Sequence, residues 1–279
     1  MEWINTLNEA LQYIESHIAD DLCADQVSEH IFCSSFHFQR VFSLLTGLTI
    51  GEYIRNRRMS LAGSELLQKH VKVIDVALKY GYETPESFSK AFTRFHGITP
   101  SSAKRDGAPL RHYAPLTIKI ILEGGHFMDY RIENKPSFDI LAMTRRFHMD
   151  SSQVEIPKFW QEFFSKGYGA VVSGWYGVCH NASEGNFSYS IADPYTPQSD
   201  IPEGFEKISV PEYTWAIFTC VGPMPHAIQD AWKKIYSEWL PSSEYELVPG
   251  YDFEYYTGPN TQDADYISEI WIPVKSKQA

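Results

Sequence analysis

The sequence predicts two domains: an all-α domain with a double helix-turn-helix, then an α+β domain with a pseudo-symmetric antiparallel sheet and two main helices. Three observations support this prediction. A residue pattern in the first hundred positions recurs at an offset of 50. The hydrophobic period changes from about 3.6 to about 2 beyond residue 115. The second half repeats itself more loosely, and 279 residues are enough for two compact domains.

The repeat at offset 50 predicts two copies of one helical motif. Each copy has a short helix, a tight turn and a second helix with a cationic residue in its middle, which is the layout of a homeodomain-like DNA reader. These central cations are Arg40 and Lys90. Two such units in one chain predict a protein that reads DNA. The residues that recur are Asp25, Phe38, Phe42, Gly47 and Thr49, which return as Asp75, Phe88, Phe92, Gly97 and Thr99.

Four helices are expected through the first copy. Apolar residues at three- and four-residue steps predict a helix over 2–18. Asp25 is expected to cap a short helix that ends near residue 32, and a second helix follows over 36–46, where Gly47 stops it. A long helix over 50–68 comes next. Its length of roughly 30 Å is close to one DNA turn of about 34 Å, so it is suited to space two readers onto successive major grooves.

The second copy is expected to follow the same course. A helix over 73–79 leads to Gly81 at the turn. Thr84 then caps a helix over 86–96, and Pro85 takes its first position. Pro100 starts a last short helix.

Charge is distributed unevenly between the halves. The chain has a net charge of −11, of which residues 1–112 contribute −1 and residues 113–279 contribute −10. Each copy of the repeat has a local excess of basic residues, which a phosphate-binding surface needs. The four cysteines lack metal-ligand spacing, and neither a signal peptide nor an apolar run of about 18 residues occurs. We therefore expect a cytoplasmic protein without metal, cofactor or membrane partner.

The linker is expected near residues 109–115, between a first domain over 1–108 and a second over 116–279, because Gly and Pro in "DGAPLRHYAP" break the helical period. Beyond it, helices are expected over 152–166 and 225–239, and they align at an offset of 72. The expected strands are "LTIKIIL", "FMDYRIE", "FDILAMTR", "WYGVCH", "FSYSIA", "YTWAIFTCV", "FEYY" and "YISEIWIPV".

The first domain resembles a known family. The stretches "SSFHFQRVFSLLTGLTIGEYIRNRRM" and "VIDVALKYGYETPESFSKAFTRFHGITPSSAKR" look like the DNA-binding domain of AraC/XylS-type transcription regulators. Arg pairs with guanine and Gln with adenine, whereas the other arginines are expected to meet phosphates. The alternative is that these side chains form ordinary solvated helix faces. The resemblance implies DNA contacts from Phe36, His37, Gln39, Arg40, Arg55, Arg57, Pro85, Glu86, Ser87, Lys90 and Arg94.

The second domain resembles another family. "GWYGVCHN", "FSYSIA", "FEKISVPEYTWAIF", "DFEYY" and "SEIWIPV" are similar to the gyrase-inhibitor-like effector-binding domain over about residues 127–275. That resemblance implies a small-molecule pocket for cationic or aromatic ligands with a central glutamate. Alternation places Glu269 beside Trp271, a second expected ligand residue. A buried acid there needs either a bound cation or a neutral, protonated form, and Glu269 is the favoured candidate for the central glutamate. Trp175 or Tyr176, together with Tyr189, is expected to complete an aromatic cage, and Glu254 is a second acid candidate. Alternatively, Glu269 faces solvent and Trp175 is simply core.

These features favour a transcription regulator, not an enzyme, that binds double-stranded DNA and a small-molecule effector. RNA polymerase is a further expected partner, and a homodimer is an open possibility. One alternative is a gyrase-inhibitor-like hydrolase in which Glu269 and Tyr176 act on electrophilic toxic compounds. Another is a DNA-bending or anti-gyrase protein with a vestigial pocket.

Overall fold

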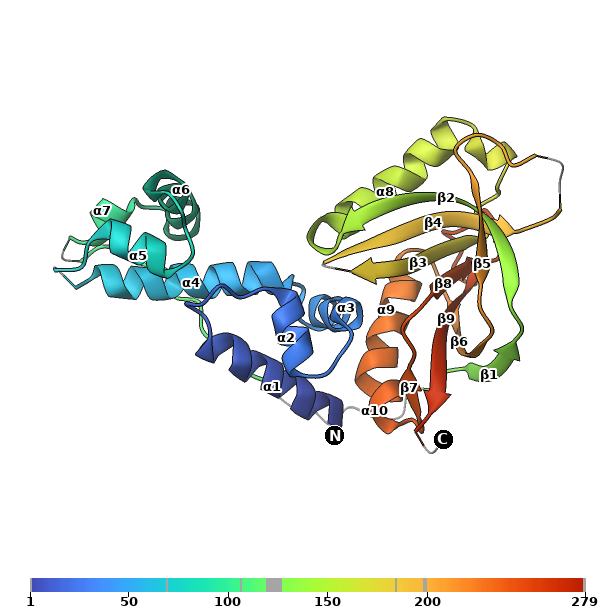
Figure 1. The fold of residues 1–279 in the computed structure, drawn as a ribbon, viewed down its shortest axis with the longest axis horizontal. Helices are drawn as coiled ribbons and strands as arrows, with labels where there is room; N and C mark the ends of the chain where they lie inside the picture. Colours follow the sequence, from blue (N-terminus) through green and yellow to red (C-terminus); the bar gives the residue numbers. More distant parts are fainter. Residues whose placement is uncertain are drawn as a thin grey trace. The chain divides into compact units, whose positions relative to one another are not determined.

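The computed structural model describes residues 2–68, 70–105, 107–118, 127–183, 185–197 and 200–277. They form two compact units (Figure 1). The first unit comprises Met1–Cys33 and Gly47–Ile121, and the second comprises Ser34–Thr46 and Leu122–Ala279. The second helix of the first repeat therefore packs with the second unit. The boundaries expected at 108 and 116 remain predictions. The expected strand over 116–122 falls largely on residues outside the described part of the chain.

The helices of the double repeat form where the sequence predicts them, to within a few residues. The fully buried rings of Phe88 and Phe92 pack with Met59, Leu66 and Tyr80, as the recurrence of the phenylalanines predicts. The helices are α1 (Glu2–Ser16), α2 (Ala24–His30), α3 (Ser35–Thr46), α4 (Ile50–Leu66), α5 (Val73–Lys79), α6 (Pro85–His96) and α7 (Pro100–Ala103).

Polar caps and left-handed glycines define the helix ends. The Thr84 hydroxyl accepts a hydrogen bond from the Ser87 backbone N–H at 3.2 Å, which confirms the predicted cap of α6. Gly97 ends that helix with φ of +77°, a conformation that strains any residue with a Cβ atom. One expected cap is wrong. Cys23 occupies the cap position of α2, and Asp25 lies in its first turn, where the helix dipole still favours a negative charge.

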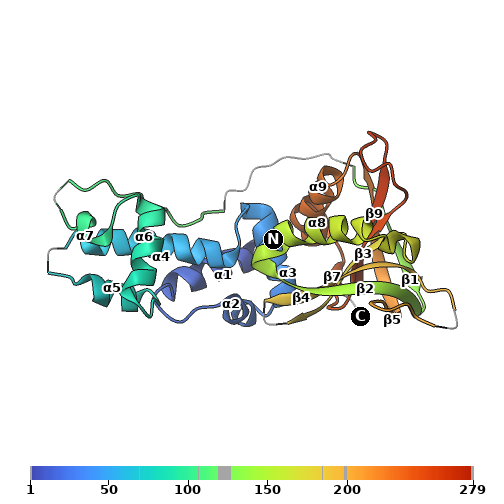
Figure 2. The same cartoon turned by 90° about the horizontal axis from the view of Figure 1, so that it is seen from above.

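The second unit is built around one antiparallel sheet, with α8 and α9 lying against it (Figure 2). Strands β5 and β7 were not expected. The strands are β1 (Tyr130–Lys135), β2 (Phe138–His148), β3 (Tyr176–Ser183), β4 (Asn186–Pro194), β5 (Glu206–Val210), β6 (Tyr213–Val221), β7 (Tyr245–Leu247), β8 (Asp252–Tyr256) and β9 (Ile267–Ser276). The helical segments are α8 (Met149–Ser165), η1 (Tyr168–Ala170), α9 (His226–Lys234), the π-turn η2 (Ile235–Trp239) and α10 (Leu240–Ser242).

The strand order confirms the predicted duplication of this domain. The order is β1-β6-β9-β8-β3-β4-β2-β5, so β6, β9 and β8 of one half mirror β2, β4 and β3 of the other. The first strand of each half pairs with the opposite half, because β1 joins β6 and β5 joins β2. The two halves are thus joined by exchanged edge strands in one continuous sheet.

The two faces of the sheet carry different side chains. Asp252 pairs with Cys179 and Cys179 with Tyr189, so these three residues share the face that α8 and α9 cover. Phe253 pairs with Trp271, and both belong to a buried cluster on the opposite face. The predicted ligand residues are therefore divided. Tyr189 and Glu254 lie on the helix-covered face, whereas Tyr176, Glu269 and Trp271 lie on the other.

Candidate DNA-reading helices and effector site

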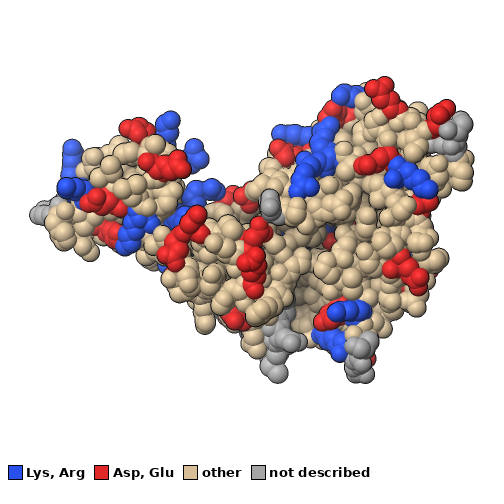
Figure 3. All heavy atoms as spheres, in the orientation of Figure 1, with Lys and Arg blue, Asp and Glu red and all other residues tan. Residues whose placement is uncertain are grey.

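Helix α6 presents its predicted reading face to solvent. Its apolar side chains point into the core, while Ser87, Lys90 and Arg94 are exposed and Pro85 is half-buried. Glu86 is exposed in the first turn, where a negative charge suits the helix dipole. Figure 3 shows Lys and Arg side chains around α5, α6 and α7, interspersed with acidic ones. This geometry is compatible with the predicted DNA contacts of α6.

Arg57 on α4 is held inside the first unit. Its side chain is buried, and its Nε and Nη2 atoms donate to the two Glu15 carboxylate oxygens at 2.8 Å each. Tyr53 donates to the same carboxylate at 2.6 Å, and Arg57 also donates to the Tyr113 carbonyl. A guanidinium with all these partners has little capacity left for a phosphate, which opposes the DNA contact expected of Arg57. Its neighbour Arg55 is exposed, as that prediction requires.

Helix α3 differs from α6, because its predicted reading face is covered by other parts of the second unit. The Phe36 ring packs against Phe187, with 5.3 Å between ring centroids. His37 and Gln39 are buried, and the Gln39 amide donates to the Ser35 hydroxyl at 3.0 Å. Hence His37 and Gln39 do not present their polar atoms to solvent as a free helix face would, and the Phe36 ring is engaged with Phe187.

The Arg40 side chain lies in a cage of acids and aromatic rings. Its Nη1 lies 3.2 Å from Asp252 Oδ2 and its Nη2 lies 3.5 Å from Glu254 Oε1. The guanidinium carbon lies 3.6 Å from the centroid of the Trp232 ring, well within the range of a cation–π interaction. His37 Nε2 lies 3.7 Å from Asp252 Oδ2. We call Trp232, Asp252 and Glu254, with Arg40 between them, the arginine cage.

The arginine cage is well shielded from water. The exposed fractions of the side chains are 16% for Arg40, 4% for Asp252 and 19% for Glu254. Burial disfavours the charged guanidinium, but the acidic groups around it, Cys179, Tyr236, Asp252 and Glu254, outweigh this effect and raise the pKa of Arg40. A buried cation is thus matched by two carboxylates.

Glu254 is fixed in place by its other partners. Trp232 Nε1 donates to its Oε1 atom at 3.0 Å, and the Tyr256 hydroxyl donates to Oε2 at 2.9 Å. Burial raises the pKa of Tyr256, which keeps that phenol protonated as a donor. Nearby Tyr189 accepts a hydrogen bond from Trp160 Nε1 at 3.0 Å. Alternation in "YDFEYY" places Asp252, Glu254 and Tyr256 on one face, so this signal was available in the sequence.

Glu269, the favoured candidate from the sequence, already has a cation of its own. Arg131 donates to both carboxylate oxygens, at 2.9 and 3.3 Å, and Trp271 Nε1 donates at 2.7 Å. The ring centroids of Tyr176 and Trp271 lie 5.9 Å apart. Trp175 stacks on Tyr255, and 38% of the Trp175 surface is exposed. The expected neighbours of Glu269 are therefore present, apart from Tyr189, but its charge is neutralised by an arginine that is itself half exposed.

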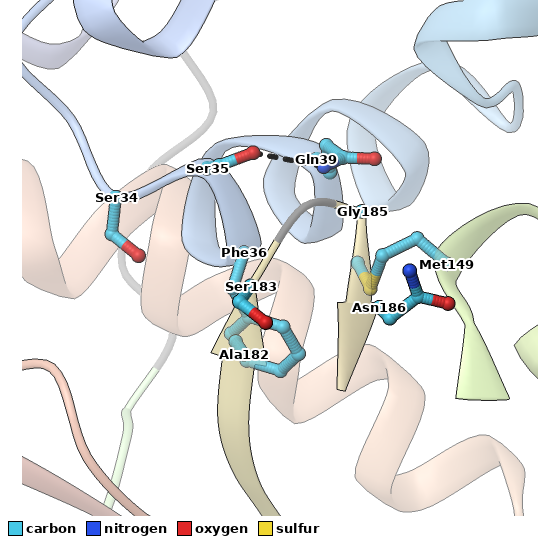
Figure 4. Close-up of a pocket in the computed structure, with 9 residues that line it drawn as sticks. All are labelled: Ser34, Ser35, Phe36, Gln39, Met149, Ala182, Ser183, Gly185 and Asn186. Atoms are coloured by element: carbon cyan, nitrogen blue, oxygen red, sulfur yellow. Dashed lines mark hydrogen bonds between the residues drawn. The ribbon is translucent and has the colours of Figure 1, made fainter. Parts of the chain in front are cut away.

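A separate small pocket lies beside α3. Its volume is about 60 Å³, against the roughly 300 Å³ at the lower end of small-molecule pockets. Figure 4 shows Phe36 and Gln39 from α3 next to side chains from β3 and β4. This pocket is too small for a drug-sized effector. Its lining residues are Ser34, Ser35, Phe36, Gln39, Met149, Ala182, Ser183, Gly185 and Asn186.

Within the described ranges, no group of three or more His, Cys, Asp or Glu side chains is arranged to hold a metal ion. Across the same part of the chain, none of the helices combines the length and apolar character that crossing a membrane requires.

Comparison with known proteins identifies both domains. The model of the family described as integron-associated effector binding protein matches residues 131–274, and that of a helix-turn-helix domain matches residues 27–106. The transcriptional activator AarP of Providencia stuartii is 40% identical over 95 residues, 34% of this chain and 70% of AarP. The regulatory protein SoxS of Salmonella typhimurium is 37% identical over 91 residues, 33% of this chain and 85% of SoxS.

A third relative extends over both domains. The transcriptional regulator Rob of Salmonella typhimurium is 23% identical over 295 aligned positions, which cover 99% of this chain and 100% of Rob. Both resemblances expected from the sequence are confirmed, and nothing found favours the hydrolase alternative. The chain belongs to the integron-associated effector-binding family and to the AraC-type regulators, and it is a DNA-binding transcription regulator with a gyrase-inhibitor-like effector domain.

Proposed function

We propose that the effector of this regulator is a planar cation, and that the arginine cage is its binding site. The observation that supports this proposal most directly is the cage itself, in which a guanidinium already lies on Trp232 between Asp252 and Glu254. A guanidinium held in this way supports a ligand of the same chemistry. A flat, delocalised cation that donates hydrogen bonds matches both the indole face and the carboxylates.

Charge balance favours Glu254 over Glu269 as the acid that meets the effector. Glu254 and Asp252 share one arginine, so the two carboxylates exceed the cations bonded to them. Glu269 and Glu133 instead face Arg131 and Lys135, which balance them. An effector near Glu269 would have to compete with an arginine that already donates to both oxygens of that carboxylate.

DNA contacts are proposed for α6 and α3. The support for α6 is that Lys90 and Arg94 are exposed on one polar face above a fully packed core. We also propose the contacts predicted for Pro85, Glu86 and Ser87, which lie in the first turn of α6. For α3, Phe36, His37, Gln39 and Arg40 remain proposed contacts of a helix that leaves its present position.

The test of the effector site compares two isosteric substitutions, Glu254→Gln and Glu269→Gln, in the full chain. Benzamidinium is the probe and neutral benzamide is its shape control, both titrated by calorimetry. We expect Glu254→Gln to weaken benzamidinium binding by about 2 kcal/mol, because a desolvated cation loses one of its counter-charges. Benzamide binding should change little, and so should benzamidinium binding to Glu269→Gln. Loss of benzamidinium affinity in Glu269→Gln alone would place the site on the other face of the sheet.

Further roles follow from the assignment as a regulator. We propose that the second domain binds its ligand without converting it, because the matched relatives are transcription regulators. The similarity to AarP, a transcriptional activator, supports activation and hence a contact with RNA polymerase. A cytoplasmic location is proposed because DNA is the target. Association of two chains is a further proposal, and light scattering measures it.

A further inference from the structure

We infer that Arg40 is an internal ligand of the effector site, so that a cationic effector releases helix α3 for DNA reading. This inference rests on the proposed function of the arginine cage. The same side chain meets two demands, since Arg40 is the expected base reader of the first repeat and the cation inside the cage. It cannot satisfy both at once, because only 16% of its surface is exposed in the cage.

The other predicted DNA contacts on α3 are covered together with Arg40. Phe36 packs on Phe187, and His37 lies against Asp252. Gln39 is only 7% exposed. All four predicted contacts of this helix are therefore covered while Arg40 occupies the cage. A helix in this position has no reading face to present to a major groove.

The cage also explains why a cation would exchange with Arg40. Once Arg40 leaves, Asp252 and Glu254, which had shared one guanidinium, have no arginine between them. Two neighbouring carboxylates without a counter-charge repel each other, so this state favours the binding of another cation. The class of effector that fits is an amidinium or a guanidinium carried by a flat group, since it reproduces the stacking on Trp232 and the two-sided hydrogen bonding.

Competition of this kind couples the two ligands of the protein. An effector that takes the cage shifts the population toward chains with α3 released, and these bind DNA better. By reciprocity, DNA that holds Arg40 empties the cage and raises effector affinity by the same factor. The effector therefore acts by replacing one arginine, and it needs no contact with DNA.

The first experiment titrates benzamidinium into the full chain and into Arg40→Gln by calorimetry. Removing the internal ligand makes the whole population competent for binding, so we expect affinity to rise roughly tenfold or more. Arg94→Gln, which removes an exposed arginine from α6, is the matched control and should not change affinity. Arg40→Lys, which keeps the charge without the planar fork, should fall between wild type and Arg40→Gln. Thermal shifts with benzamidinium give a second readout on folded protein.

The second experiment measures DNA binding without touching a predicted DNA contact. Asp252→Asn removes one of the two carboxylates that bind Arg40. We therefore expect it to raise the affinity of the protein for a DNA duplex selected for binding to it about five- to tenfold in the absence of effector. Adding benzamidinium should produce a similar gain in wild type. Glu269→Gln is the control and should behave as wild type in both conditions.

The outcomes separate this inference from the proposed effector site. If Arg40→Gln leaves benzamidinium affinity unchanged while Glu254→Gln lowers it, the site stands and the internal ligand is refuted. If neither substitution alters binding, both proposals fail. If Arg40→Gln binds more tightly but Asp252→Asn and benzamidinium leave DNA affinity unchanged, the release of α3 is refuted.

Discussion

Helices α3 and α6 occupy equivalent positions in the internal repeat, yet their polar faces have different surroundings. On α6 the central cation, Lys90, is exposed, as is Arg94 one turn later. On α3 the equivalent cation, Arg40, lies between two carboxylates and above an indole ring. Two phenylalanines recur at equivalent positions, Phe38 and Phe42 against Phe88 and Phe92, and all four are fully buried.

This difference shows what an internal duplication determines. Shared phenylalanines and turn glycines specify how each copy folds, because they form the core and the left-handed helix ends. They do not specify what the polar face meets. Arg40 and Lys90 also differ chemically, since a planar guanidinium stacks on an indole and pairs with two acids better than an ammonium group does. The arginine at this position suits the arginine cage, and the lysine suits a phosphate-facing surface.

The largest expected effect is on stability. It concerns Arg57 on α4, which lies outside the two reading helices and is expected to stabilise the fold instead of contacting DNA. Arg57→Ala should lower the free energy of unfolding by about 3 kcal/mol, near the lower end for a broken buried ion pair, because Glu15 loses its partner while a quarter of its side chain is exposed. Arg55→Ala removes an exposed neighbour and should leave stability unchanged, while reducing the salt slope of DNA binding by about one. Urea unfolding followed by circular dichroism, with anisotropy for DNA, distinguishes them.

The same pair predicts a pH dependence. Burial alone would raise the pKa of Glu15, but hydrogen bonds from Arg57 and Tyr53 hold it below its ordinary value of 4.5. A depressed carboxyl pKa stabilises the folded state above the unfolded value, and this contribution is lost as the pH falls through the folded pKa. The stability difference between wild type and Arg57→Ala should therefore shrink below about pH 4.5. A constant difference down to pH 3 would contradict the role of Glu15.

The next effect tests the comparison directly through DNA binding. Lys90→Ala and Arg40→Ala should each cost about 1–3 kcal/mol at a selected duplex when benzamidinium is present. Without benzamidinium, Lys90→Ala should cost the same, whereas Arg40→Ala should cost less because its side chain then lies in the arginine cage. DNA affinity is measured by fluorescence anisotropy. If Arg40→Ala weakened DNA binding equally with and without benzamidinium, α3 and α6 would not differ in their accessibility to DNA.

Most of the fold could be predicted from periodicity and turn chemistry. The helices of both repeats follow from apolar spacing, and Thr84, Gly47 and Gly97 mark their ends as expected. The exchange of edge strands between the halves of the sheet could not be predicted, because β5 is short and carries charged residues at its start. Pairing partners so distant in sequence leave no local signal.

The candidate site was predicted in part. Alternation placed Glu269 and Trp271 together, but it could not reveal that Arg131, on a strand far away in sequence, would neutralise the acid. Glu254 was identified as a candidate, whereas Trp232 was not, although it lies in the helix expected over 225–239. The meeting of Arg40 with Glu254 joins positions 214 residues apart and depends on tertiary packing alone.

The smallest effect concerns the start of α6. Thr84 accepts a hydrogen bond from the Ser87 N–H, so Thr84→Ala leaves an N–H group of the first turn without its partner and should cost about 1 kcal/mol of stability. The first turn carries Glu86 and Ser87, hence fraying there should weaken specific DNA binding, while benzamidinium binding to the arginine cage should not change. Thr84→Ser restores the hydroxyl and should recover both stability and DNA affinity. If Thr84→Ala altered benzamidinium affinity as much as Arg40→Gln does, the effector site would respond to α6, and the distinction drawn between the two helices would be wrong.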